Sequence, residues 1–477
     1  MRIFKQQSFN SWFTVVASIQ LFIGLFKLLS IPTILYDEPL YSYTALFFSE
    51  NAHFQHEFHQ FSGKEFCFYP FLLGCVFFIF GPSLLAGRLL SVVLGIVGLY
   101  FFMKLLSQLS LRNSVIGLLS ICFVFLNTNF VAFRIIRPEA LLLCLACMLA
   151  WYLFKYFNLN ITTKKDKISL GFCLAGIIST HMVGALFGIC IGISILIFSV
   201  KFKSLHDLKW ILLGSLLPLS IFIGNILHIL VGTGFTSQAA KVTPNLTVFK
   251  KNVSLFFLKN YVMGFKRGFI VLFELAFIAL ACINKRYFIR VLGLSAVFVL
   301  AYGLFSISDF IRPYYSLFPI LALIIFAYLF NQVSAKKRSL LLGILILYFA
   351  NHFAGDAFIF YKNFKATSIQ EIQTSFKPFL PAKPISIGGP KKLWFISPNL
   401  NWLSLNATDT LPNSFYYFYH SKNKTGVSSL SQSPDVYYNN ASSPPPKLQK
   451  TFKNKHFKLI AEDSFTGYDL IQLYKIY

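Results

Sequence analysis

The sequence predicts an α-helical polytopic membrane protein with about eleven transmembrane helices, followed by a small mixed α/β domain outside the cytoplasm. Of its 477 residues, 56% are hydrophobic and only 13% are charged, whereas about 25% of a soluble domain is charged. The hydrophobic residues fall in blocks of roughly 17–24 with few charges, the length that crosses ~30 Å of hydrocarbon. A soluble protein with a large core would instead show shorter, amphipathic runs.

The formal net charge of +26 is distributed as membrane topology requires. Many basic residues lie in short segments between hydrophobic blocks, and no Gly-rich phosphate loop or nucleic-acid module accompanies them. The eight cysteines lie in or beside hydrophobic segments, so neither a disulfide framework nor a zinc ribbon is indicated. We therefore expect the lipid bilayer as a partner, and no nucleic acid.

The first hydrophobic block follows Arg2 and Lys5 and is too long for the apolar region of a signal peptide, so we predict a retained signal anchor. The fifth and sixth blocks form one nearly continuous run broken around His181, which leaves the number of spans open by one or two. The expected spans are residues 11–31, 83–105, 113–132, 138–157, 168–181, 183–200, 209–231, 268–284, 290–307, 312–332 and 339–355.

The loops between these spans predict the orientation. With the N-terminus in the cytoplasm, alternate loops are short and basic, as cytoplasmic loops should be. An odd number of spans then places 32–82, 232–267 and the tail on the extracytoplasmic side. The tail alternates short apolar runs with Pro, Asn and Ser and is long enough for one small domain. We therefore divide the chain into a transmembrane domain, 1–357, and an extracytoplasmic C-terminal domain, 358–477.

Asp37 and Glu38 stand immediately after the first span, in YDEPLYSYTALFFSE. Two adjacent carboxylates beside a membrane repel each other and lose solvation, so we expect them only where they are paired, metal-bound or used in chemistry. The alternative is a helix that starts here, with Pro39 at its first position and acids in its first turn.

Glu139 opens the fourth span, in FRIIRPEALLL. An acid that enters a hydrophobic helix is costly and indicates a functional site by default. Arg134 and Arg137 are its expected partners, and an ion pair that merely closes the helix end is the alternative. Glu274, in the middle of the eighth span, is expected to make a satisfied contact between helices.

Several segments in chain order fit the motifs of one family. The acidic segment fits DExxYxxxAxxxxE through Asp37, Glu38, Tyr41, Ala45 and Glu50. FGPSLLAGRLLSVVLG, with Arg88, resembles FGxxxxxARLxSxLxG, and RIIRPEALL fits RxxRPDxLL with Glu139 in place of Asp. GIISTHMVG carries His181 where the family's TKGxxG motif often has Lys, and RPYYSLFPILAL carries Arg312 and Tyr314. The chain thus resembles the GT-C glycosyltransferases of the protein O-mannosyltransferase type, which include the bacterial lipid A aminoarabinose transferases.

The resemblance implies a polyprenyl-phosphate sugar as donor and chemistry at the outer membrane–water boundary. Asp37 would be the general base that deprotonates the acceptor hydroxyl as it attacks the anomeric carbon, with inversion and loss of the lipid phosphate. Glu38 and Glu139 would either orient the acceptor or hold a divalent metal ion. The implied substrate-binding residues are Tyr41, Glu50, Lys64, Arg88, Arg134, Arg137, His181, Lys266, Arg267, Arg312 and Tyr314, where ordinary headgroup anchoring is the alternative for the cations.

Two departures from the family pattern stand out. Phe68 replaces the Lys of the family's KPPL motif, and Glu139 replaces an Asp. They leave open a divergent acceptor or an inactive relative.

The expected function is therefore transfer of a sugar from a polyprenyl-phosphate donor to a hydroxyl or phosphate of lipid A, another glycan or a protein. The expected location is the periplasmic face of a bacterial inner membrane, in the cell envelope. The alternatives are a lipid or solute transporter or flippase, and a non-catalytic membrane accessory protein. Transporters usually show internal repeats and ionisable residues near the midplane, whereas this sequence shows no clear repeat and gathers its acids at the outer boundary.

Overall fold

The structure is a computed structural model. The chain folds into two compact units. The first comprises Met1–Phe26, Phe61–Leu73 and Leu89–Ala357, and the second comprises Lys27–Gln60, Gly74–Arg88 and Phe358–Tyr477. The residues described are 2–31, 38–50, 66–159, 163–202, 204–233, 246–253, 268–306, 316–380, 387–388, 391–396, 402–403, 414–421, 455–465 and 469–477.

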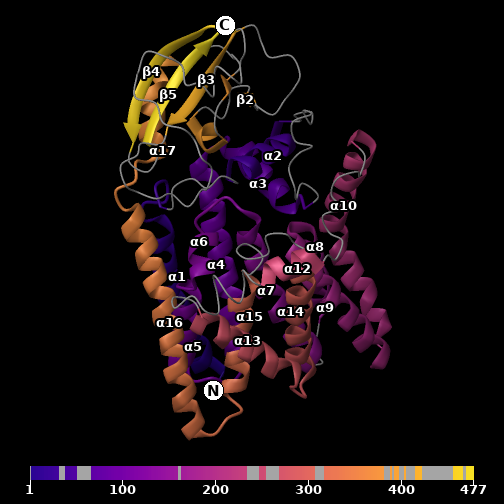
Figure 1. The fold of residues 1–477 in the computed structure, drawn as a ribbon. Coiled ribbons are helices and arrows are strands. Elements are labelled where there is room, and N and C mark those ends of the chain that lie inside the picture. Colours follow the sequence, from indigo (N-terminus) through magenta and orange to yellow (C-terminus); the bar gives the residue numbers. More distant parts are fainter. Residues whose placement is uncertain are drawn as a thin grey trace. The chain divides into compact units, whose positions relative to one another are not determined.

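The first unit is a bundle of helices (Figure 1). The helices that lie wholly within it are α1 (Arg2–Leu25), α5 (Asn113–Val124), α6 (Asn127–Ala132), α7 (Pro138–Phe154), η2 (Lys155–Leu159), α8 (Lys164–Thr180), α9 (Met182–Lys201), η3 (Leu205–Asp207), α10 (Leu208–Thr233), α12 (Leu246–Val253), α13 (Gly268–Cys282), α14 (Tyr287–Ser306) and α15 (Leu317–Phe330). It also includes most of α4 (Leu84–Gln108) and α16 (Ala335–Asn363).

The predicted fold class is confirmed, since every expected span except the third overlaps a single α-helix. Among the described residues, six helices are long and apolar enough to cross a membrane, and five shorter helices are also apolar. A total of eleven spans stays a prediction.

Two breaks shape these helices. The run between the fifth and sixth spans breaks at His181, as expected, because this residue is extended and its Nδ1 accepts the backbone N–H of Val183 at 3.2 Å. The third expected span is two helices rather than one. Asn129, on the second of them, donates from Nδ2 to the carbonyl of Phe123 at 2.7 Å, which satisfies a carbonyl at the end of the first.

Two glycines bring α8 and α10 into close contact. A Cβ on Gly171 would collide with the carbonyl of Ile211, and a Cβ on Gly214 would collide with the carbonyl of Ile168. The Ser215 hydroxyl donates across the same crossing to the carbonyl of Gly171 at 3.1 Å. Small residues of this kind allow transmembrane helix backbones to approach each other.

The Gly214→Leu substitution is expected to lower the unfolding temperature of the purified protein, because overpacking a tight contact costs about 1–3 kcal/mol. Gly224→Leu is the matched control on the same helix, since nothing lies within 4 Å of a Cβ placed there. Thermal unfolding in detergent measures both variants. Equal unfolding temperatures for the two would show that the glycine crossing does not support the bundle.

The second unit contains a five-stranded sheet with strand order β2-β1-β3-β5-β4 (Figure 1). The pairs β3–β5 and β5–β4 are antiparallel, whereas β1 runs parallel to β2 and β3. Its elements are α2 (Glu38–Glu50), the last part of α3 (Phe68–Phe80), α17 (Ile369–Phe376), η6 (Lys377–Phe379), β1 (Ile387–Gly388), η7 (Lys391–Ile396), β2 (Trp402–Leu403), β3 (Phe415–Ser421), β4 (Phe457–Phe465) and β5 (Asp469–Ile476).

Both faces of this sheet carry buried apolar side chains. Tyr417 and Tyr474 are cross-strand partners in a cluster on one face. On the other face the Phe376 ring of α17 packs edge-on against Phe418, with ring centroids 5.3 Å apart. α17 starts where the Ser368 hydroxyl accepts the N–H of Glu371 at 3.2 Å. The predicted mixed α/β tail is thus confirmed.

Candidate functional site

A buried ion pair marks the start of α2. Arg88, near the start of α4, donates from Nε and Nη2 to the two carboxylate oxygens of Glu38, at 2.9 and 2.8 Å. Both side chains are 0% exposed. α2 begins at Glu38 with Pro39 next to it, so the helix start that the sequence predicted here is present as well. Both oxygens of this carboxylate are therefore engaged by one guanidinium.

The same guanidinium also reaches back to the segment that follows α1. Arg88 Nη1 donates to the carbonyl of Leu28 at 2.6 Å. One side chain thus joins Leu28 and Glu38, which are ten positions apart in the sequence. Asp37 immediately precedes Glu38 and belongs to this segment, but it lies outside the described residues.

Lys27 forms the turn that leads from α1 into this segment. Its backbone is left-handed, with φ 47°, and its carbonyl accepts the N–H groups of Ser30 and Ile31 at 3.0 and 2.9 Å. The ammonium donates to the carbonyl of Phe364 at 2.5 Å and lies 3.9 Å from the centroid of that ring. This contact joins Lys27 to the residue that directly follows α16, within the second unit.

In the first unit, Arg134 caps the C-terminal end of α1. Its Nη1 donates to the carbonyls of Ile23 and Gly24, and its Nη2 donates to that of Phe26 at 2.7 Å. The carbonyls of Ile23 and Gly24 belong to the last turn of the helix, and that of Phe26 follows it directly. A cation is favoured there by unsatisfied acceptors and by the helix dipole.

Arg137 and Glu139 lie at the start of α7. Arg137 Nη2 is 2.8 Å from Glu139 Oε1, with the Arg137 side chain 17% exposed and that of Glu139 6% exposed. Arg137 is the extended N-cap residue and Pro138 occupies the first helical turn. The structure thus pairs Arg137 with Glu139, one of the two pairings that the sequence predicted for this acid.

Of the predicted residues not placed above, the structure describes only those on α2. Tyr41 lies on α2 and is partly buried, and Glu50 ends that helix, although its side chain is not described. Asp37, Lys64, Lys266, Arg267, Arg312 and Tyr314 lie outside the described residues. Within the described part of the chain, no group of three or more His, Cys, Asp or Glu side chains could hold a metal ion. The divalent ion therefore stays a prediction.

A small cavity lies beside Arg134. Its volume is about 20 Å³, space for roughly one water molecule, and it is far too small for a sugar phosphate. The side chains of Gln20 and Asn129 bring polar atoms to its wall. This cavity is therefore not a substrate site.

Sequence reasoning missed a polar contact between α6 and α16. The backbone N–H of Asn127 donates to His352 Nδ1 at 3.0 Å, and its side-chain Nδ2 donates to Asp356 Oδ1 at 2.8 Å. The expected contact of Glu274 is confirmed, because the hydroxyl of Tyr348 donates to its Oε1 at 2.8 Å. Tyr348, His352 and Asp356 are spaced four residues apart, so the polar stripe on this apolar helix was a usable signal.

Neither a family model nor a curated protein sequence matches the chain. Solved structures that match include ArnT from Cupriavidus metallidurans bound to undecaprenyl phosphate, with a TM-score of 0.65 and 12% identity over 98% of each chain. The apo state of ArnT from the same organism matches with a TM-score of 0.59 and 13% identity, again over 98% of each chain. The chain has the fold of ArnT.

ArnT is a lipid A aminoarabinose transferase with a GT-C fold, so the fold that five short motifs predicted is confirmed. The similarity to ArnT concerns the fold. The two departures from the family pattern, Phe68 and Glu139, occur in a chain of which 98% is matched. Phe68 is the first residue of α3 and packs edge-on against Phe172, with ring centroids 5.9 Å apart. Where the family has a Lys, this chain therefore has an apolar contact within the bundle.

Proposed function

We propose that the chain is a membrane glycosyltransferase that moves a sugar from a polyprenyl-phosphate carrier to a hydroxyl or phosphate acceptor on the extracytoplasmic face of a bacterial inner membrane. The observation that carries the proposal is the likeness to ArnT over 98% of both chains, in a structure that holds undecaprenyl phosphate. The motifs support it, because four of their charged residues form two ion pairs at helix starts.

In this proposal Asp37 is the general base and Glu38 is a positioning residue. A base must reach the acceptor proton directly or through one water. Glu38 is fully buried and both of its oxygens accept hydrogen bonds from Arg88. Its role is to hold the start of α2, next to which Asp37 stands in the sequence.

We assign contact with the donor phosphate to Arg137 rather than to Arg88 or Arg134. The departing lipid phosphate needs its charge stabilised, and arginine suits that role through paired N–H donors. Arg88 and Arg134 are buried and engaged with backbone carbonyls, whereas Arg137 is partly exposed and close to Glu139. Glu139 then orients this guanidinium, and Lys64, Lys266, Arg267 and Arg312 remain candidate cations.

The test is a transfer assay with the full chain in lipid nanodiscs. The donor is undecaprenyl phosphate that carries a radiolabelled pentose or hexose, and lipid A, a membrane glycan fraction and a peptide mixture serve as acceptors. We expect label in one acceptor and stoichiometric release of undecaprenyl phosphate. Parallel reactions with EDTA measure metal dependence.

The same protein in sealed vesicles separates the alternatives. A transporter would move the labelled lipid or solute between leaflets or compartments without cleaving the sugar–phosphate bond. An accessory protein would do neither. An intact donor with every sugar and acceptor would overturn the proposed transferase activity.

A further inference from the structure

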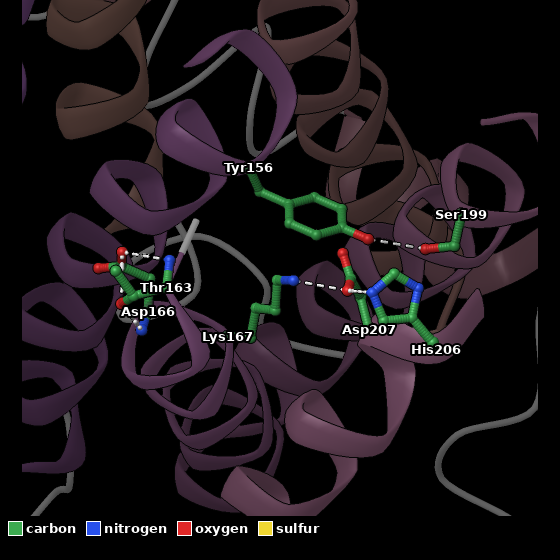
Figure 2. Close-up of polar contacts among 7 residues, drawn as sticks. All are labelled: Tyr156, Thr163, Asp166, Lys167, Ser199, His206 and Asp207. Atoms are coloured by element: carbon green, nitrogen blue, oxygen red, sulfur yellow. Dashed lines mark hydrogen bonds and ion pairs between the residues drawn. The ribbon is translucent and has the colours of Figure 1, made fainter. Parts of the chain in front are cut away.

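One end of the first unit, where α7, α8, α9 and α10 meet, carries a cluster of charged and polar side chains (Figure 2). The side chain of Asp166 forms a capping box with Thr163 at the start of α8 and pairs with Lys155. Burial alone raises the pKa of Asp166, but the hydrogen bonds from Lys155 and Thr163 outweigh it and hold the pKa below its usual value. This acid is therefore ionised and already neutralised.

The second acid of the cluster is also neutralised. Asp207 Oδ1 lies 2.5 Å from Lys167 Nζ and 2.8 Å from His206 Nε2, as Figure 2 shows. Lys167 and Asp207 are mostly buried, so they connect η3 to α8 and add little charge to the surface. Nearby, the hydroxyls of Tyr156 and Ser199 share a buried hydrogen bond of 2.8 Å.

The remaining lysines at this end form a surface with an excess of positive charge. Lys164, Lys165, Lys201 and Lys209 are exposed, and none of them is paired with an acid in the described contacts. Lys164 and Lys209 converge on one indole, with their ammonium groups 5.0 and 5.3 Å from the centroid of Trp210. Two cations from different helices thus share one aromatic ring.

Exposed apolar side chains lie beside these lysines in the sequence. Phe202 is 58% exposed and Leu205 is 52% exposed, in the short connection between α9 and α10. Both helices are apolar and long enough to cross a membrane. Tryptophan and lysine at the end of a spanning helix are typical of headgroup depth, where the apolar parts contact lipid and the ammonium groups reach the polar boundary.

We propose that this surface binds an anionic phospholipid headgroup, whose phosphate is held by Lys164 and Lys209 at Trp210. A lipid fits better than a soluble anion because the apolar side chains beside the lysines require a hydrocarbon partner. Asp166 and Asp207 are already paired with Lys155 and Lys167, so they do not balance the charge of Lys164 and Lys209. The phosphate of an anionic headgroup would balance it. The proposal is independent of the transferase activity.

The test measures phosphatidylglycerol binding to the purified full chain by native mass spectrometry. The double variant Lys164→Gln/Lys209→Gln is expected to weaken that binding at least about tenfold, since each lysine near an anionic headgroup adds to the electrostatic attraction that holds the lipid. The matched control is Lys336→Gln/Lys337→Gln, which removes two exposed lysines from the start of another spanning helix. The control is expected to bind within about twofold of the unchanged protein.

Three results would overturn the lipid proposal. Equal binding by both double variants, or equal affinity for phosphatidylcholine, would overturn the proposal. Competition by millimolar inorganic phosphate without any lipid retention would show that the surface binds free phosphate instead. Should the double variant fail to fold, the emission of Trp210, identified by its absence from Trp210→Phe, is measured with brominated phosphatidylglycerol and with brominated phosphatidylcholine. Stronger quenching by phosphatidylglycerol supports the site, and equal quenching by the two lipids refutes it.

Discussion

The Asp37→Asn variant is expected to lose sugar transfer by at least about a hundredfold while it remains inserted and folded, because a positioned general base contributes about 10²–10⁴ in rate. An amide keeps the shape of the side chain but cannot accept the acceptor's proton. The neighbouring carboxylate cannot replace it, since Glu38 is buried and held by Arg88 through both oxygens. The rate of undecaprenyl phosphate release measures the effect.

Asp37→Glu is the chemical control for this experiment. It retains a carboxylate and is expected to keep part of the activity. Thermal unfolding of both variants should match that of the unchanged protein. Transfer by Asp37→Asn at the unchanged rate would refute the assignment of the base and leave the fold untouched.

Arg88→Met is expected to destabilise the protein by about 3–5 kcal/mol, the cost of leaving a buried carboxylate without its partner. Methionine fills a similar volume, so the loss comes from Glu38 and from the Leu28 carbonyl rather than from a cavity. The measurement is the thermal unfolding of purified protein, together with the yield of folded protein.

The double variant Arg88→Met/Glu38→Gln separates the effect of the unpaired buried charge from the effect of the lost Arg88–Leu28 hydrogen bond. Removing both charges is expected to restore much of the stability, because a neutral pair avoids the isolated buried charge. Transfer should remain impaired, since the hydrogen bond to Leu28 is still missing. Recovery of full activity would show that the Arg88–Leu28 hydrogen bond has no part in the reaction.

The sequence predicted those parts of the site that depend on neighbours along the chain. Pro138 starts α7, Arg137 pairs with Glu139 two positions away, and the helical run breaks at His181. In each case the signal is local, because a proline, a charged residue at a helix start or an interrupted apolar run constrains the adjacent backbone directly.

Contacts between distant segments could not be read in the same way. The Arg88–Glu38 pair joins positions 50 residues apart, and the contact of Lys27 with Phe364 spans 337 residues. Hydrophobic periodicity identifies helices without saying which polar atoms meet after packing. The left-handed backbone of Lys27 was equally hidden, since lysine has no preference for that conformation.

The hydrogen bonds between Asn127 and the His352–Asp356 pair limit how α16 can move. A shift of this helix along its axis by one turn, about 5.4 Å, would carry Asp356 away from its amide partner and leave its carboxylate in an apolar interior. Gly355 keeps the approach close, since a Cβ there would be 3.2 Å from Asn127 Nδ2. The two hydrogen bonds from Asn127 therefore oppose a one-turn slide of α16 along α6.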